Sequence, residues 1–164
     1  MTPSPLLLLL ALAAATPAAT SPTPPPPAGA VSPVEAHALR LHPGDDLKQA
    51  LVAYARAKHL RAGFVATCVG SLRETRLRFA DQHDATAIAG KMEIVSLVGT
   101  VAEGSAHLHL SVADGQGRAF GGHLVDGCIV YTTAEIVLGE LPALRFERRP
   151  DPVTTYSELT IEPR

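Results

Sequence analysis

Three of the seven histidines stand where their imidazoles could bind one metal ion. His107 and His109 lie two residues apart in a segment typical of a β-strand, so both side chains point to the same face. The turn signal at 114–117 predicts a hairpin, and a loop centred on Gln116 places His123 directly opposite His109. Cross-strand neighbours of this kind have Cβ atoms about 4.5–5.5 Å apart. Three neutral imidazoles at that spacing suit zinc and leave a fourth position open for water or substrate.

The same histidines also have a plainer interpretation. A His-x-His pair is common on half-exposed strands that bind nothing. Gly121 and Gly122, which precede His123, allow a close approach of the backbone but could equally mark a bulge. Imidazole accepts nickel, copper and iron as well as zinc, so the residues predict a divalent metal, with zinc as the first choice.

Three further residues are candidates for catalysis. Glu93 opens an apolar run and Glu135 lies inside another, where a carboxylate is costly to bury unless it is paired. Either could act beside a metal as a general base or as a hydrogen-bond partner of a ligand, or could simply face solvent. Arg40, between Leu39 and Leu41, could hold an anion, pair with one of these acids, or lie on a strand surface. The sequence names no reaction, and whether the protein is an enzyme stays open.

The elements that would position these residues are mainly strands. Asp45 and Asp46 offer a helix N-cap, and apolar residues at helical spacing predict one amphipathic helix over 46–60, ended by Gly63. The segment 81–90 is polar and is predicted to be a loop. Strands are expected at 35–42, 64–69, 74–80, 93–101, 106–112, 119–120, 128–138 and 154–161, with breaks at 70–71 and 121–122. The predicted fold class is α+β: a mainly antiparallel sheet with one principal helix packed on it.

Composition narrows the classes of partner. The chain has 164 residues, a length that favours a single domain. Its formal net charge is −2, so it lacks the excess of basic residues that binding to nucleic-acid phosphates requires. The charge therefore argues against nucleic acid as a partner. Cys68 and Cys128 lie in apolar segments without a Cys-x-x-Cys motif, so they are either a disulfide pair or two buried thiols.

The N-terminal segment predicts export. The apolar run over 6–15 is too short to span a bilayer and fits the core of a signal peptide, although no Lys or Arg precedes it. We expect a signal peptide at 1–20, a Pro-rich disordered linker at 21–34 and a folded domain at 35–164. The mature protein would be secreted or periplasmic, with no membrane association after cleavage. The alternatives are a misassigned start or a disordered Ala/Pro leader.

Linked motifs over about 38–161 resemble the PPC (plants and prokaryotes conserved) domain family. Residues 39–41 followed by 43–46 resemble its first strand and helix start. Residues 90–99 are similar to the Gly-Arg-Phe-Glu-Ile-Leu-Ser-Leu-Ser-Gly segment of plant members. His107-Leu-His109, then the glycines at 115 and 117, then Gly121-Gly-His-Leu124, resemble the family's most distinctive stretch.

The resemblance implies an α+β domain that assembles as a homotrimer, with the histidine cluster close to subunit contacts and with a metal in some prokaryotic members. Plant members place the domain beside an AT-hook. This chain lacks an Arg-Gly-Arg-Pro hook, since Arg148-Arg149-Pro150 has no glycine, and Lys91 and Met92 replace the plant Arg and Phe. Three hypotheses follow. The first is a metal-binding trimer outside the cytoplasm, with hydrolytic or small-ligand chemistry at an open zinc. The second is a DNA-associated or regulatory oligomerisation module without catalysis, and the third is a structural oligomeric scaffold whose histidines bind nothing.

Overall fold

The computed structural model describes residues 28–164. The expected signal peptide and linker residues 21–27 lie outside the described residues, and residues 28–34 form neither helix nor strand. In the described part of the chain, no helix combines the length and apolarity needed to cross a membrane.

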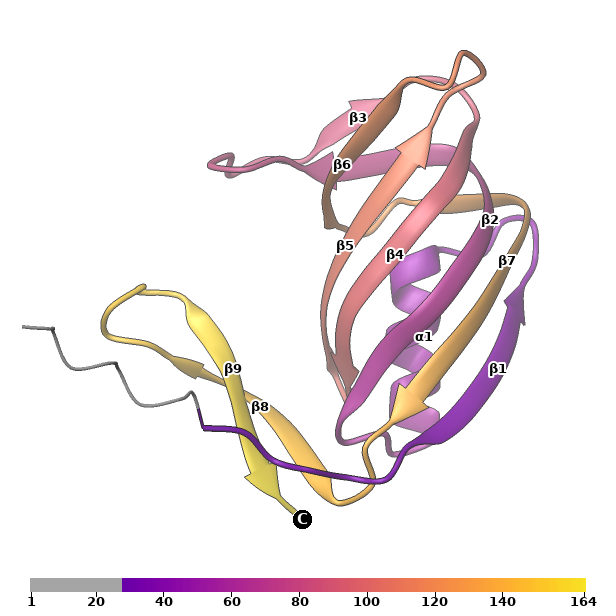
Figure 1. Cartoon of the computed structure of the whole chain (residues 1–164). Coiled ribbons are helices and arrows are strands. Elements are labelled where there is room, and N and C mark those ends of the chain that lie inside the picture. Colours follow the sequence, from indigo (N-terminus) through magenta and orange to yellow (C-terminus); the bar gives the residue numbers. More distant parts are fainter. Residues whose placement is uncertain (1–27) are drawn as a thin grey trace, which may run out of the picture.

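One antiparallel sheet forms the centre of the fold (Figure 1). Its strands run in the order β1-β7-β2-β4-β5-β6, and the short β3 pairs with β2 outside this path. The strands are β1 (Glu35–Leu41), β2 (Gly63–Arg78), β3 (Thr86–Ile88), β4 (Met92–Ala102), β5 (Ser105–Ala113), β6 (Ala119–Leu124) and β7 (Ile129–Glu140). Residues 28–164 contain one helix, which packs on this sheet, so the α+β prediction is confirmed.

The sheet closes on itself at one end, because β2 pairs with both β4 and β6. The first two-thirds of β2 run beside β4, whereas Leu77 and Arg78 at its end pair with Leu124 and His123 of β6. Strands β2, β4, β5 and β6 therefore form a closed ring that holds β6 between two neighbours.

Helix α1 (Leu47–Ala57) covers one face of the sheet (Figure 1). Asp46 is its N-cap, as predicted: its Oδ1 accepts hydrogen bonds from the amides of Lys48 and Gln49 at 3.0 Å. Its Oδ2 accepts another from the amide of Gly127 at 2.6 Å, which ties the helix start to the segment before β7. The helix face toward the sheet is fully buried through Leu47, Leu51 and Ala55.

The core lies between this helix and the inner face of the sheet. Alternate residues of β5 point inward, since Leu108, Leu110 and Val112 are at most 2% exposed. Ile136 and Leu138 of β7 join the same apolar cluster. Because the inward positions of β5 are all apolar, its polar positions must face away from α1.

The last two strands form a separate hairpin. β8 (Leu144–Pro150) and β9 (Ser157–Pro163) pair with each other, and the hairpin projects away from the main sheet (Figure 1). Its base is held where the amide of Phe146 donates to the carbonyl oxygen of Arg61 at 2.9 Å.

Several predicted boundaries are wrong for identifiable reasons. The break expected at 70–71 is an irregularity within the continuous β2, where Gly70 has φ +151° and a Cβ would overlap the carbonyl oxygen of Thr133. The helix ends at Ala57 with Lys58 as C-cap and His59 in the left-handed region, whereas Gly63 begins β2. Gly121 and Gly122 are part of β6, the expected loop contains β3, and the strand expected over 154–161 begins at Ser157.

Candidate metal centre

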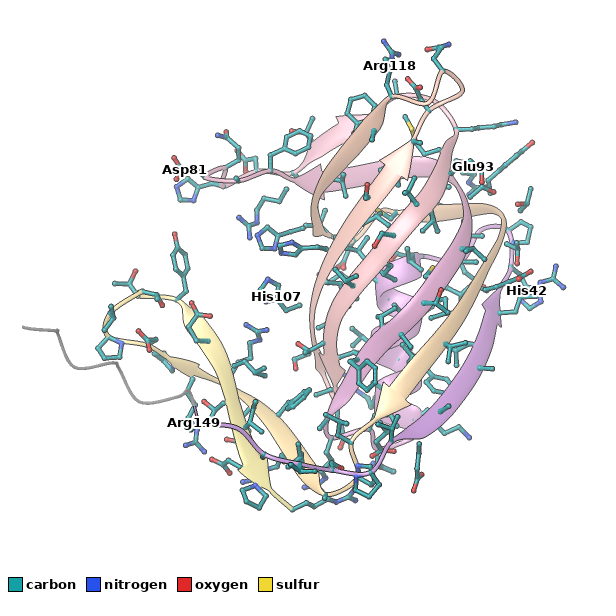
Figure 2. The ribbon with its side chains drawn as sticks, in the orientation of Figure 1. His42, Asp81, Glu93, His107, Arg118 and Arg149 are labelled. Carbon is teal, nitrogen blue, oxygen red and sulfur yellow. The ribbon has the colours of Figure 1, made fainter. Side chains whose placement is uncertain are left out.

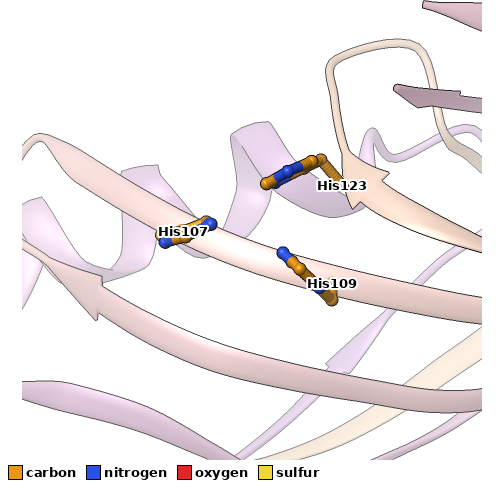
Figure 3. Close-up of side chains that lie close together, drawn as sticks. All are labelled: His107, His109 and His123. Atoms are coloured by element: carbon orange, nitrogen blue, oxygen red, sulfur yellow. The ribbon is translucent and has the colours of Figure 1, made fainter. Parts of the chain in front are cut away.

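The three histidines predicted to share a metal meet on the face of the sheet opposite α1. His107 and His109 project from β5 and His123 from β6, with His109 and His123 directly paired in the strand register. The hairpin register predicted from the turn is thus confirmed. Each ring offers one nitrogen, and the three nitrogens lie within 4.8 Å of one another (Figure 3).

The rings are packed closely enough to converge on one point. The centroids of His109 and His123 are 4.3 Å apart, and the ring of His107 lies 5.2 Å from each of them. Tetrahedral zinc with Zn–N bonds of 2.0–2.1 Å requires nitrogens about 3.3 Å apart. Side-chain rotations that bring the nitrogens together by about 1.5 Å at most would complete such a site, so the donor set fits a tetrahedral metal with one open position.

A row of paired residues across three strands fixes the position of His123. Arg78 of β2, His123 of β6 and His109 of β5 are consecutive partners in the ladder, so their side chains share one face. Gly122 makes this row possible, because a Cβ at that position would lie 2.8 Å from the carbonyl oxygen of Arg78. Gly122 therefore serves the close backbone approach that was one of the two roles predicted for the adjacent glycines, whereas a Cβ at Gly121 would meet only an ordinary contact at 3.7 Å.

The surroundings favour the neutral, metal-binding form of two imidazoles. Desolvation lowers the pKa of His107, and the positive charges of Arg148 and Arg78 lower it further. Desolvation also lowers the pKa of His123, with Arg78 as the next contribution. A neutral imidazole presents a lone pair to a cation, so these shifts act in favour of metal binding.

Two cavities adjoin the cluster. One of about 400 Å³ lies along the open face and is lined by His109, His123, Val98 and Gly122 among others. The second, of about 670 Å³, lies between the cluster and the β8–β9 hairpin and includes His107 and His123 in its wall. Both volumes fall within the range of small-molecule sites. A small ligand could therefore reach the fourth position on an ion held by the three histidines.

The other predicted candidates are not brought into the histidine cluster. Glu93 is exposed on β4 opposite Ala113, about 15 Å along the sheet from Val98, the strand partner of His109. Figure 2 shows Glu93 well away from His107. Glu135 on β7 and Arg40 on β1 are exposed strand partners of each other.

The Nε of Arg40 donates to the Thr133 hydroxyl at 3.1 Å. None of Arg40, Glu93 and Glu135 lines either cavity beside the histidines. The chemical roles considered for these three residues stay predictions.

Sequence reasoning did not find the charged residues that flank the cluster. Arg78 and Lys48 line the larger cavity from the body of the fold, and Arg148, Tyr156 and Glu158 line it from the hairpin. Arg78 becomes a neighbour of His123 only through the β2–β6 pairing, which joins residues 45 positions apart and leaves no local signal. The only sequence signal for this pairing was Gly121-Gly122 before His123, which allows another strand to approach closely.

Sequence comparison then decides the family. The Plants and Prokaryotes Conserved (PCC) domain matches residues 28–142, which include the helix, the closed ring and all three histidines. The chain belongs to the PCC domain family. The β8–β9 hairpin lies beyond the residues matched to the PCC domain.

Relatives of this PCC domain occur alone and within larger proteins. The chain is 51% identical over 129 residues to the bifunctional protein GlmU of Synechococcus sp. (strain JA-3-3Ab), a match that covers 79% of this chain. It covers 21% of GlmU, so the chain spans about a fifth of the length of that curated relative. A structure of a hypothetical protein from Salmonella enterica is 44% identical, with a TM-score of 0.81, covering 82% of this chain and 98% of that one.

A more distant structure shares the PCC fold. It is described as a metal-containing protein from Archaeoglobus fulgidus, and it superposes with a TM-score of 0.69 at 24% identity. The match covers 80% of this chain and 99% of that chain. At this level of identity the likeness concerns the fold.

Proposed function

We propose that this PCC domain binds a divalent metal ion, with zinc as the first choice, through His107, His109 and His123. The observation that carries the proposal is the convergence of three imidazole nitrogens within 4.8 Å on one face of the sheet. Three nitrogen ligands leave one position to water or to a small ligand from the adjoining cavities. The description of the Archaeoglobus protein as metal-containing adds support from a chain of the same fold.

Metal analysis of the purified protein tests the proposal. We expect about one zinc per chain after incubation with zinc and removal of excess, and a loss of most of it in His109→Ala, because two imidazoles remain. His42→Ala is the matched control, since His42 has a side chain 68% exposed and lies far from His107 (Figure 2). Negligible zinc in all three proteins, or equal zinc in all three, would remove the proposed centre.

We propose that the domain assembles as a homotrimer through the sheet face that α1 leaves uncovered. Val69, Val95 and Val98 support this, because these apolar side chains on β2 and β4 are 53–58% exposed in the single chain. Exposed apolar side chains gathered on one face are typical of protein contacts. Light scattering on a sizing column should give three times the chain mass, and Val98→Asp should lower it. A monomer in both cases would refute the assembly.

We also propose that the chain is exported through its leader at 1–20. The apolar run over 6–15 and the small residues after it support the proposal. Fractionation of cells expressing the full chain, followed by N-terminal sequencing, should find a mature protein that begins near Ser21 outside the cytoplasm. An intact N-terminus on a cytoplasmic protein would contradict it.

A further inference from the structure

The cavity between the histidine cluster and the β8–β9 hairpin has two chemically different walls. His107 and His123 contribute imidazoles from the main sheet, and Arg148, Tyr156 and Glu158 contribute from the hairpin. In Figure 2 the His107 side chain lies in the space between the sheet and the hairpin. A volume of about 670 Å³ is sufficient for a small organic molecule beside the ion.

Among the described residues, two guanidinium groups that line this cavity have no carboxylate partner. Two of the three arginines of the hairpin are paired, since Arg145 and Arg149 both contact Glu147. Within residues 28–164, by contrast, neither Arg78 nor Arg148 forms an ion pair with a carboxylate.

Each of the two has one hydrogen bond to the backbone. Arg78 donates to the carbonyl oxygen of Gln82 at 3.2 Å, and Arg148 donates to that of Ser157 at 3.1 Å. Most of the five N–H donors of each guanidinium are therefore left for a ligand.

The charges around the cavity favour an anion once a metal is bound. Lys48 is paired with Asp126 at 3.1 Å, so it adds little. Asp81 and Glu158 also line the cavity and balance the charges of Arg78 and Arg148 at a distance. A divalent ion on three neutral imidazoles would then add two positive charges with no protein anion as its ligand.

We infer that this cavity binds a small molecule through an oxyanion group, a carboxylate or a phosphate. One oxygen would take the open position on the metal, and the others would accept hydrogen bonds from Arg78 and Arg148. Guanidinium groups match both kinds of oxyanion because their N–H donors form a planar fork. The inference rests on the proposed metal site, and it assigns to the hairpin outside the PCC match a role in holding the ligand.

Calorimetric titration of the zinc-loaded full chain tests the inference, with inorganic phosphate and acetate as the two probes. Arg78→Gln and Arg148→Gln should each weaken binding of the preferred probe by about tenfold or more, the effect of losing a hydrogen bond to a charged group. Arg73→Gln is the matched control, because Arg73 is exposed on the same strand as Arg78 but lines neither cavity. Cobalt-substituted protein provides a second readout, since an anion that ligates the ion changes the visible spectrum. The probe that binds more tightly identifies the class of oxyanion.

The outcomes separate this inference from the proposed metal site. Normal zinc content with no binding of either probe, or with equal probe affinity in all the arginine variants, overturns the inference and leaves the metal centre intact. If the wild-type chain holds no zinc, the proposed function fails and the comparison is made on the metal-free chain. In the metal-free chain, a tenfold loss of probe affinity in Arg78→Gln and Arg148→Gln, but not in Arg73→Gln, still supports the arginine subsite. Equal probe affinities in all variants overturn it.

Discussion

Substitution of Gly122 by alanine tests whether closure of the strand ring positions His123. A Cβ at Gly122 would lie 2.8 Å from the carbonyl oxygen of Arg78 and 3.4 Å from the Cβ of Leu77. The first distance is shorter than any ordinary carbon–oxygen contact and involves backbone, so β6 and β2 must separate by several tenths of an ångström. Overpacking of this kind typically lowers the free energy of unfolding by about 1–3 kcal/mol.

The same displacement should weaken metal binding. β6 carries His123, whereas His107 and His109 remain on β5, so a shift of β6 changes the spacing of the three nitrogens. Metal–ligand distances tolerate deviations of only about 0.2 Å. We therefore expect Gly122→Ala to bind zinc about 10–100-fold more weakly, the range seen when a residue that orients a ligand is changed.

The neighbouring glycine provides a matched control. At Gly121 the nearest atom to an added Cβ is the carbonyl oxygen of Leu110, at an ordinary contact distance of 3.7 Å. Gly121→Ala should change the free energy of unfolding by less than about 0.5 kcal/mol. Urea unfolding followed by circular dichroism gives the stability, and competition with a chromophoric chelator gives the zinc affinity. Equal stability and equal zinc affinity in the two variants would refute the close approach as the reason for Gly122.

Three further outcomes are expected. Burial raises the pKa of Cys68 to about 12 and that of Cys128 to about 11, so both thiols stay protonated at pH 8. They should react with a thiol reagent only after unfolding in urea, and rapid reaction of the native chain would contradict their burial. Asp46→Ala should lower the free energy of unfolding by about 2 kcal/mol, because two helix amides and the Gly127 amide lose their acceptor. Asp46→Asn keeps the cap oxygen, so thermal melts should place it closer to wild type than Asp46→Ala; equal loss in both variants would contradict the cap. With a net charge of −2, the chain should not retard an AT-rich duplex at low salt in a gel-shift titration, and a shift at micromolar protein would support the DNA-associated alternative.

The parts of the site encoded by local sequence were predictable. Alternation within a strand put His107 and His109 on one face, and the turn centred on Gln116 set the pairing of His109 with His123. Both inferences depend on residues within one hairpin, where the period of two and the loop length determine the geometry. The N-cap at Asp46 was predictable for the same reason.

Features that depend on distant segments were not predictable. Gly70 was interpreted as a break between two strands. A local pattern cannot distinguish the end of a strand from a bulge that accommodates the neighbouring strand β7. The pairing of Arg78 with His123 arises from closure of the ring, and β8 was missed because Leu144–Pro150 carries three arginines and little apolar alternation. The two cysteines, for which pairing was left open, are both free and buried.

His123 lies on β6, a strand that has a hydrogen-bonded neighbour on each edge, and not on a mobile loop. β6 is paired with β5 along one edge and, at His123 and Leu124, with β2 along the other, so the pairing that holds the His123 backbone does not require an ion. In zinc fingers the metal supplies the folding energy, and a chelator unfolds the domain. Here a chelator should remove the ion while the domain stays folded. Loss and uptake of the ion would then be reversible without unfolding.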